Sequence, residues 1–127
     1  MSRAIADTSV FIAREAGRPL GALPEEIAVS VVTAAELELG VLRAPDQPSR
    51  ATRLATLSRV RAEYPLLEID ASTASCFARI ADEQFSAGRR LRRHDTWIAS
   101  TAMRHQAAVV TQDTDFTDFT SVQVIRV

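Results

Sequence analysis

Short apolar runs alternate with longer amphipathic stretches along the chain. The short runs are rich in Val, Ile and Leu, which predicts buried strands at 3–7, 27–32, 66–69, 109–111 and 122–127. The longer stretches repeat apolar residues every three or four positions, which predicts helices at 9–16, 33–44, 49–63, 71–87 and 95–106. Glycines and prolines in the segment 17–25, together with Pro45 and Pro48, mark breaks between elements.

The order of these elements predicts the fold class. Strands that alternate with helices form mainly parallel sheets with helices on both faces. The chain has 127 residues, so we expect a single α/β domain over residues 1–127 with one sizeable core. The helical spacing places Leu54 and Leu57 on the buried side of the third helix, and Ile80 and Phe85 on that of the fourth.

Carboxylates recur beside the predicted strand ends and helix starts. Asp7 ends the first strand, Glu36 follows the second, Asp95 opens a helix and Asp113 follows the strand 109–111. Because the carboxyl ends of parallel strands lie along one edge of a sheet, we expect these four acids to converge. Converging acids repel one another unless a cation joins them, and oxygen ligands without a soft ligand suit Mg²⁺ or Mn²⁺.

Each acid also has a purely structural explanation. Asp7 and Asp95 could be helix caps, Glu36 could complete a capping box with Thr33, and Asp113 could stabilise a turn. The recurrence of all four at comparable places favours a shared site over four separate explanations.

The neighbouring acids are assigned by their distance from the predicted edge. Glu36 and Glu38 lie about 200° apart around a helix, and we choose Glu36 because it is nearer the strand end. Asp115 is a candidate outer ligand that reaches the metal through water, whereas Asp118 is expected to be a solvated turn residue.

The composition indicates a basic surface and argues against a disulfide-bonded or membrane-spanning protein. The net charge is −1, and all 15 basic residues are arginines, with no lysine. One group in the predicted loop before Asp95 is a candidate for RNA contact or a solvated face: Arg89, Arg90, Arg92 and Arg93. A single cysteine cannot form an internal disulfide, and no apolar run reaches the roughly 18 residues of a membrane span. A cytoplasmic protein without membrane contact is expected.

These motifs resemble those of the PIN-domain nucleases. The resemblance is carried by four stretches in order: Asp7-Thr8-Ser9, Glu36-Leu37 followed by Gly40, Asp95 leading Trp97-Ile98-Ala99, and Thr111-Gln112-Asp113. The small size and the spacing resemble the VapC toxins of bacterial toxin–antitoxin pairs. The resemblance covers the whole chain and implies a PIN-like fold.

The resemblance implies a function and residue roles. Asp7, Glu36, Asp95 and Asp113 would be the catalytic, metal-binding acids, with Asp115 as a further candidate. The implied activity is a Mg²⁺- or Mn²⁺-dependent ribonuclease that is silenced by a cognate VapB-like antitoxin, as a homodimer or a hetero-oligomer with it. Three hydroxyls would hold the acids, the attacking water or the substrate: Thr8, Ser9 and Thr111.

Two other interpretations stay open from the residues. One is a binding module for RNA or a partner that keeps the acids without catalysis. The other is a phosphoryl-transfer domain that gathers acids at strand ends. The absence of lysine counts against the second, because such domains use one by resemblance. Metal-dependent turnover of RNA separates the enzyme from the binding module.

Overall fold

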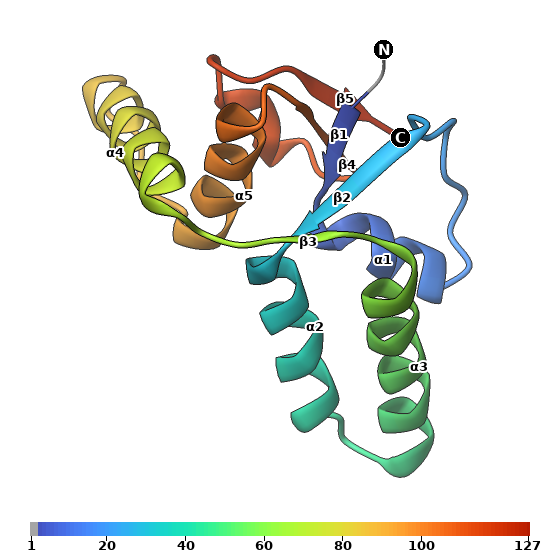
Figure 1. Ribbon diagram of the computed structural model, residues 1–127. Helices are drawn as coiled ribbons and strands as arrows, with labels where there is room; N and C mark the ends of the chain where they lie inside the picture. The colour runs from blue at the N-terminus through green and yellow to red at the C-terminus, as the bar shows by residue number, and fades with distance from the viewer. Residues whose placement is uncertain (1–2) are drawn as a thin grey trace.

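The computed structural model describes residues 3–127 and contains one fully parallel five-stranded sheet (Figure 1). The strand order is β3-β2-β1-β4-β5. The strands are β1 (Arg3–Ala6), β2 (Glu26–Ser30), β3 (Leu66–Leu67), β4 (Ala108–Thr111) and β5 (Val124–Arg126). The helices are α1 (Thr8–Glu15), α2 (Val31–Leu42), α3 (Gln47–Glu63), α4 (Ala71–Ser86) and α5 (Arg93–Arg104), with a short 3-10 helix, η1 (Asp115–Asp118). The predicted α/β class with a parallel sheet is confirmed.

Apolar residues on the two faces of the sheet form two separate cores. Successive side chains of a strand point to opposite faces. Ala4 and Ala6 of β1 therefore pack with residues of α1, α2 and α3, while Ile5 packs with residues of α4 and α5. Helices thus cover both faces, as Figure 1 shows with α1 and α3 on one side and α4 and α5 on the other.

The strand order reverses direction beside β1. From β1 the chain builds outward through β2 and β3, and then returns to add β4 and β5 on the other side. Parallel sheets bind ligands where the order reverses in this way. Asp7 directly follows β1, and Thr111 ends β4 next to it. The topology therefore brings the first and last predicted motifs together.

Two of the helix starts that were predicted too late concern site residues. α2 begins at Val31, because Ser30 ends β2 in extended conformation and its Oγ accepts from the Val32 N–H at 3.1 Å. The predicted capping box of Thr33 and Glu36 is therefore absent, and Glu36 lies in the second turn rather than the first. α5 begins at Arg93, so Asp95 lies inside the first turn and is not its cap.

Two predicted core positions are also wrong. Leu54 is 49% exposed and Phe85 is 60% exposed, whereas Leu57 and Ile80 are buried as expected. α2 and α3 run side by side beyond the edge of the sheet in Figure 1. Along residues 3–127, no helix is long and apolar enough to cross a membrane.

Candidate acidic site

Asp7 is held rigidly at the carboxyl end of β1. The residue is 4% exposed and is the N-cap of α1, which is the structural role considered for it. Its Oδ2 accepts from the Ser9 N–H at 3.4 Å, from Ser9 Oγ at 2.6 Å and from Thr111 Oγ1 at 2.9 Å. Three donors converge on one oxygen, which fixes the carboxylate plane.

The same two hydroxyls connect Asp7 to the segment after β4. Ser9 Oγ accepts from the Gln112 N–H at 3.0 Å, and Thr111 Oγ1 accepts from the Asp113 N–H at 2.9 Å. Each hydroxyl donates to the acid and accepts from backbone, so its hydrogen-bonding capacity is used in a single geometry. Asp113 is thereby placed next to Asp7, although it is itself exposed.

Glu36 is oriented from α1 and from its own helix. Thr8 Oγ1 donates to Glu36 Oε1 at 2.7 Å, and the Thr33 hydroxyl lies 3.0 Å from the same Thr8 oxygen. His94 Nδ1 lies 3.4 Å from Glu36 Oε2. Thr33 is fully buried one turn before Glu36, and its hydroxyl is a part of the site that sequence reasoning assigned only to capping.

Glu38 points away from this place. It is exposed and forms an ion pair with Arg61 of α3. Glu36 rather than Glu38 is therefore the glutamate of α2 that lies beside Thr8 and His94, and its part in a metal site stays a prediction.

The electrostatics show that the acids share one region. Burial, together with the charges of Asp7, Glu36 and Asp115, raises the pKa of Asp95 to about 6, while the charge of Arg92 opposes this rise. Burial also raises the pKa of Asp7; the hydrogen bonds from Ser9 and Thr111 oppose this, and the charge of Asp113 adds to it. Carboxylates that perturb one another in this way lie close together.

The donor chemistry fits a hard cation, although the side chains are not arranged as a preformed cage. Within residues 3–127, no three His, Cys, Asp or Glu side chains surround one point at metal-ligand distances. The acids affect one another's pKa without forming such a group, because charges interact over longer distances than coordination bonds span. All the acids offer oxygen, as Mg²⁺ and Mn²⁺ require. A bound ion would require the carboxylates to close around it.

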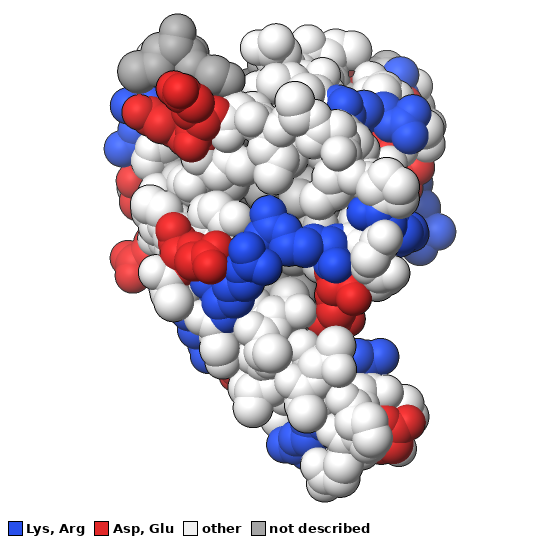
Figure 2. Space-filling view, turned by 90° about the vertical axis from the view of Figure 1, so that its right-hand side faces the viewer, with Lys and Arg blue, Asp and Glu red and all other residues white. Residues whose placement is uncertain are grey.

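The arginines of the predicted basic loop differ in whether they contact the turn after β4. Arg89 Nη1 donates to the Asp118 carbonyl at 2.7 Å, and Arg92 Nη2 donates to the Asp115 carbonyl at 2.7 Å. Arg90 and Arg93 are exposed. Figure 2 shows basic and acidic side chains interspersed on one face of the molecule, in agreement with the net charge of −1.

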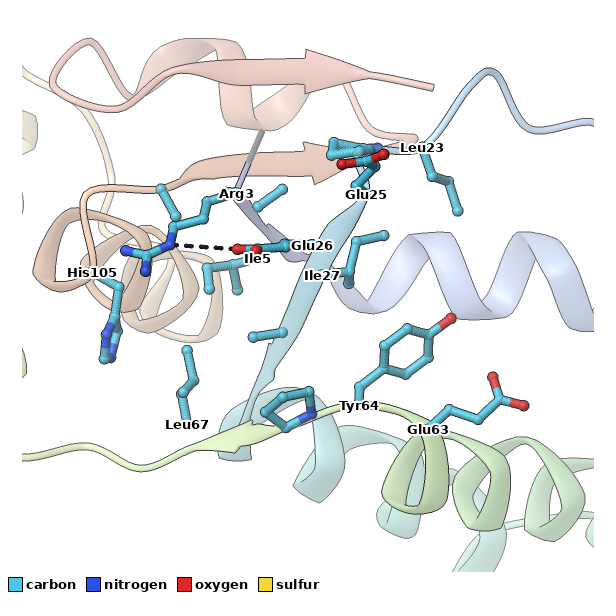
Figure 3. Close-up of a pocket in the computed structure, with 15 residues that line it drawn as sticks. Arg3, Ile5, Leu23, Glu25, Glu26, Ile27, Glu63, Tyr64, Leu67 and His105 are labelled. Carbon is cyan, nitrogen blue, oxygen red and sulfur yellow. Dashed lines mark ion pairs between the residues drawn. The ribbon is translucent and has the colours of Figure 1, made fainter. Parts of the chain in front are cut away.

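A separate hollow lies at the opposite end of the sheet, where β1 and β2 begin. It has a volume of about 620 Å³ and is lined by Leu23, Ile27, Tyr64 and Leu67, among others. Figure 3 shows the Arg3–Glu26 ion pair, at 3.6 Å, along its wall. None of the site acids lines this hollow.

Comparisons with known proteins agree with the fold. The PIN domain family matches residues 4–121. The chain is 44% identical to Ribonuclease VapC5 of Mycobacterium tuberculosis, over 97% of this chain and 94% of the relative. It is 41% identical to Ribonuclease VapC4 of the same organism, over 98% and 97% of the two chains.

Solved structures of related proteins have the same fold. The crystal structure of VapBC-5, a toxin–antitoxin system of Mycobacterium tuberculosis, contains a chain that superposes with a TM-score of 0.87 at 42% identity, over 100% of both chains. A chain of FitAcB from Neisseria gonorrhoeae superposes with a TM-score of 0.78 at 26% identity, over 96% of both chains. The protein therefore belongs to the PIN domain family and, within it, is related to the VapC proteins.

Proposed function

We propose that the protein is a Mg²⁺- or Mn²⁺-dependent endoribonuclease that hydrolyses phosphodiester bonds of RNA. The observation that carries the proposal is the convergence of Asp7, Glu36, Asp95, Asp113 and Asp115 at the switch point of the sheet. The relatives named as ribonucleases, at 41–44% identity over nearly the whole chain, support the substrate class.

The residues take distinct parts in this chemistry. Asp7, Glu36, Asp95 and Asp113 would hold the metal, with Asp115 beside them. A divalent ion at such a site lowers the pKa of a water molecule and neutralises charge on the phosphate. Two sets of hydroxyls keep the acids in place: Ser9 and Thr111 at Asp7, and Thr8 with Thr33 at Glu36.

The exposed arginines next to the site supply substrate contact. Arg90 and Arg93 lie at the entrance to α5 and could hold phosphates that flank the scissile bond. Single-stranded or looped RNA is the expected substrate, because its phosphates reach a small acidic crevice.

Cleavage assays with and without metal test the proposal. The purified chain, free of any inhibitory partner, is incubated with structured RNAs in Mg²⁺, in Mn²⁺ and in EDTA. Cleavage is expected with metal and not in EDTA, and Asp95→Asn is expected to abolish it while the fold survives. Cleavage that EDTA leaves unchanged, or no cleavage of any RNA with either metal, contradicts the proposal.

The proposed biological role is that of a toxin controlled by an antitoxin. VapBC-5, the solved complex with the matching chain, is described as a toxin–antitoxin system. A cognate antitoxin would block the acidic crevice, and an arginine of the partner could take the place of the metal among the carboxylates. The chain would then exist as a homodimer or as a hetero-oligomer with the antitoxin.

Growth measurements test this role. Induction of the chain alone should arrest growth, and co-expression of the neighbouring gene should restore it. Asp95→Asn should be harmless when expressed alone. Growth arrest by the Asp95→Asn chain, or failure of the neighbouring gene to restore growth, argues against the toxin assignment.

A further inference from the structure

Arg92 makes more contacts with acidic groups than any other basic side chain described between residues 3 and 127. Its Nη1 lies 3.3 Å from Asp95 Oδ2 and 3.6 Å from Asp115 Oδ2, and its Nη2 lies 3.7 Å from Asp118 Oδ2. The same Nη2 donates to the Asp115 carbonyl at 2.7 Å. The guanidinium carbon lies 5.2 Å from the centre of the Phe119 ring. We call this set of contacts the Arg92 clasp.

The clasp joins two segments that are distant in sequence. Asp95 belongs to the first turn of α5, whereas Asp115, Asp118 and Phe119 belong to the turn between β4 and β5. Phe119 is 3% exposed and packs on Phe116, so one side of the guanidinium rests on a rigid apolar surface. A planar guanidinium with donors on two edges suits a place where several oxygens must be held in fixed directions.

The backbone of Arg92 is fixed as well. Its carbonyl accepts from the Thr96 N–H at 2.9 Å and from Thr96 Oγ1 at 2.6 Å. The side chain is therefore anchored at its base by α5 and at its tip by the turn. Gln84 Nε2 and Arg89 Nη1 bind the Asp118 carbonyl from the other side, which holds the turn without using the carboxylate of Asp118.

We infer that Arg92 is a positioning residue for the acidic site, which holds the turn that carries Asp115 and follows Asp113 against the start of α5. The acids of β1 and β4 are aligned by hydroxyls, but Asp95 approaches them from a helix on one face of the sheet. Arg92 links that helix to the turn by direct contact, since its Nη1 lies close to the carboxylates of both Asp95 and Asp115. The kinetic part of this inference rests on the proposed ribonuclease function.

The contacts argue against phosphate binding as the main role of Arg92. Its side chain is 29% exposed, and both terminal nitrogens already face oxygens of the chain. Arg90 and Arg93, in contrast, are exposed and are the better candidates for RNA contact. The two roles predict different kinetics, because loss of a positioning residue lowers kcat, while loss of a ground-state contact raises KM.

Steady-state cleavage by Arg92→Gln, Arg92→Lys and Arg79→Gln separates these roles. Arg79 is an exposed arginine of α4, so its variant controls for the loss of one positive charge and should match the parent. For Arg92→Gln we expect kcat to fall by about ten-fold or more, because a displacement of about 1 Å can cost about 100-fold. KM should stay within about two-fold of the parent, with an unchanged salt dependence. Arg92→Lys should lie between the two, because it keeps the charge but loses the planar fork.

A substrate-free measurement tests the clasp itself. Arg92→Gln, Asp118→Asn and the double variant are compared in EDTA by denaturant unfolding. Asp118 is chosen because it is outside the proposed metal ligands. If the clasp exists, the double variant should lose less stability than the sum of the single variants.

Each outcome supports or contradicts the positioning role of Arg92. A raised KM and a flattened salt dependence in Arg92→Gln, with kcat retained, would make Arg92 an RNA contact and overturn the inference. Additive stability losses in the cycle would also overturn it, even if Arg92→Gln itself folds poorly. If the parent chain cleaves no RNA, the proposed function fails, and the cycle still decides whether Arg92 joins the two segments.

Discussion

The Thr33 hydroxyl is the least expected part of the acidic site. Thr33 is fully buried and lies 3.0 Å from the Thr8 oxygen that donates to Glu36. The sequence could not reveal this, because a threonine in the first turn of a helix has many common roles. Asp7 was easier to predict, since an acid at the end of an apolar strand lies at the functional edge of any parallel sheet.

Replacing Thr33 by valine tests whether the hydrogen bonds from Thr33 through Thr8 to Glu36 hold that carboxylate in place. Valine keeps the shape and removes one hydrogen bond, so we expect the free energy of unfolding to fall by about 1 kcal/mol. kcat should fall because Thr8 holds Glu36 less rigidly. Thr101→Val is the control, since Thr101 is equally buried and donates to the Trp97 carbonyl. Thr101→Val should lose similar stability and keep the kcat of the parent. Equal kcat values in Thr33→Val and Thr101→Val would show that Thr33 does not help to position Glu36.

The raised pKa of Asp95 predicts how stability without metal depends on pH. An exposed aspartate titrates near 3.9, and Asp95 titrates at about 6 in the folded chain, so the folded state binds more protons between these values. The free energy of unfolding in EDTA should therefore fall as the pH rises from about 4 to 7. The penalty is at most about 3 kcal/mol, and smaller because the side chain is 28% exposed.

Asp95→Asn should remove the part of this pH dependence that Asp95 contributes, while Asp7, whose pKa burial also raises, keeps its own part. At pH 7.5 in EDTA the variant should be more stable than the parent, by about 1–2 kcal/mol after loss of the Arg92 contact is included. At pH 4 the two chains should be close to equal, because both then carry a neutral side chain. Denaturant unfolding at the two pH values checks this. A variant that is less stable than the parent at pH 7.5 would mean that Arg92 outweighs the repulsion among the acids.

The helices show what periodicity can predict. Their number and order follow from apolar spacing, and the sheet follows from their alternation with strands. The sequence pattern predicts the start of α2 two positions too late, because Ser30 and Thr33 are both good caps and only the end of β2 decides between them. The exposure of Leu54 and Phe85 depends on which helices lie beyond the sheet, and the spacing of residues does not contain that information.

The geometry of α2 predicts that kcat depends strongly on one of two neighbouring glutamates and hardly on the other. Glu36 faces Thr8 and His94, while Glu38 pairs with Arg61 of α3 on an exposed surface. Glu36→Gln should lower kcat by about 100-fold, in the range seen when a group that stabilises charge is removed. Glu38→Gln should leave kcat near that of the parent and cost less than about 1 kcal/mol of stability. A larger kcat effect at Glu38 would reverse the assignment of the helix faces.

For the molecule as a whole, substrate binding depends on a few arginines rather than on a general positive field. The net charge is −1, and several arginines are already paired within the chain, among them Arg59, Arg61 and Arg92. This distribution could not be predicted, because two acidic partners of Arg92, Asp115 and Asp118, lie more than 20 positions away on a separate turn.

Replacing Arg90 and Arg93 by glutamine should therefore weaken RNA binding. The plot of log affinity against log salt should flatten by about one unit of slope for each lost phosphate contact. Filter binding by metal-free Asp95→Asn, with and without the two replacements, measures this without cleavage. An unchanged slope would leave Arg90 and Arg93 as ordinary solvated residues.

Direct titration with Mn²⁺ tests the claim that the carboxylates form one cation site. Free Mn²⁺ is followed by electron paramagnetic resonance with the parent, Asp95→Asn and Glu38→Gln. The parent and Glu38→Gln should bind saturably and alike, whereas Asp95→Asn should bind at least about ten-fold more weakly, a loss of about 1.4 kcal/mol. No saturable binding by the parent, or equal affinity in the parent and Asp95→Asn, would contradict a shared metal site.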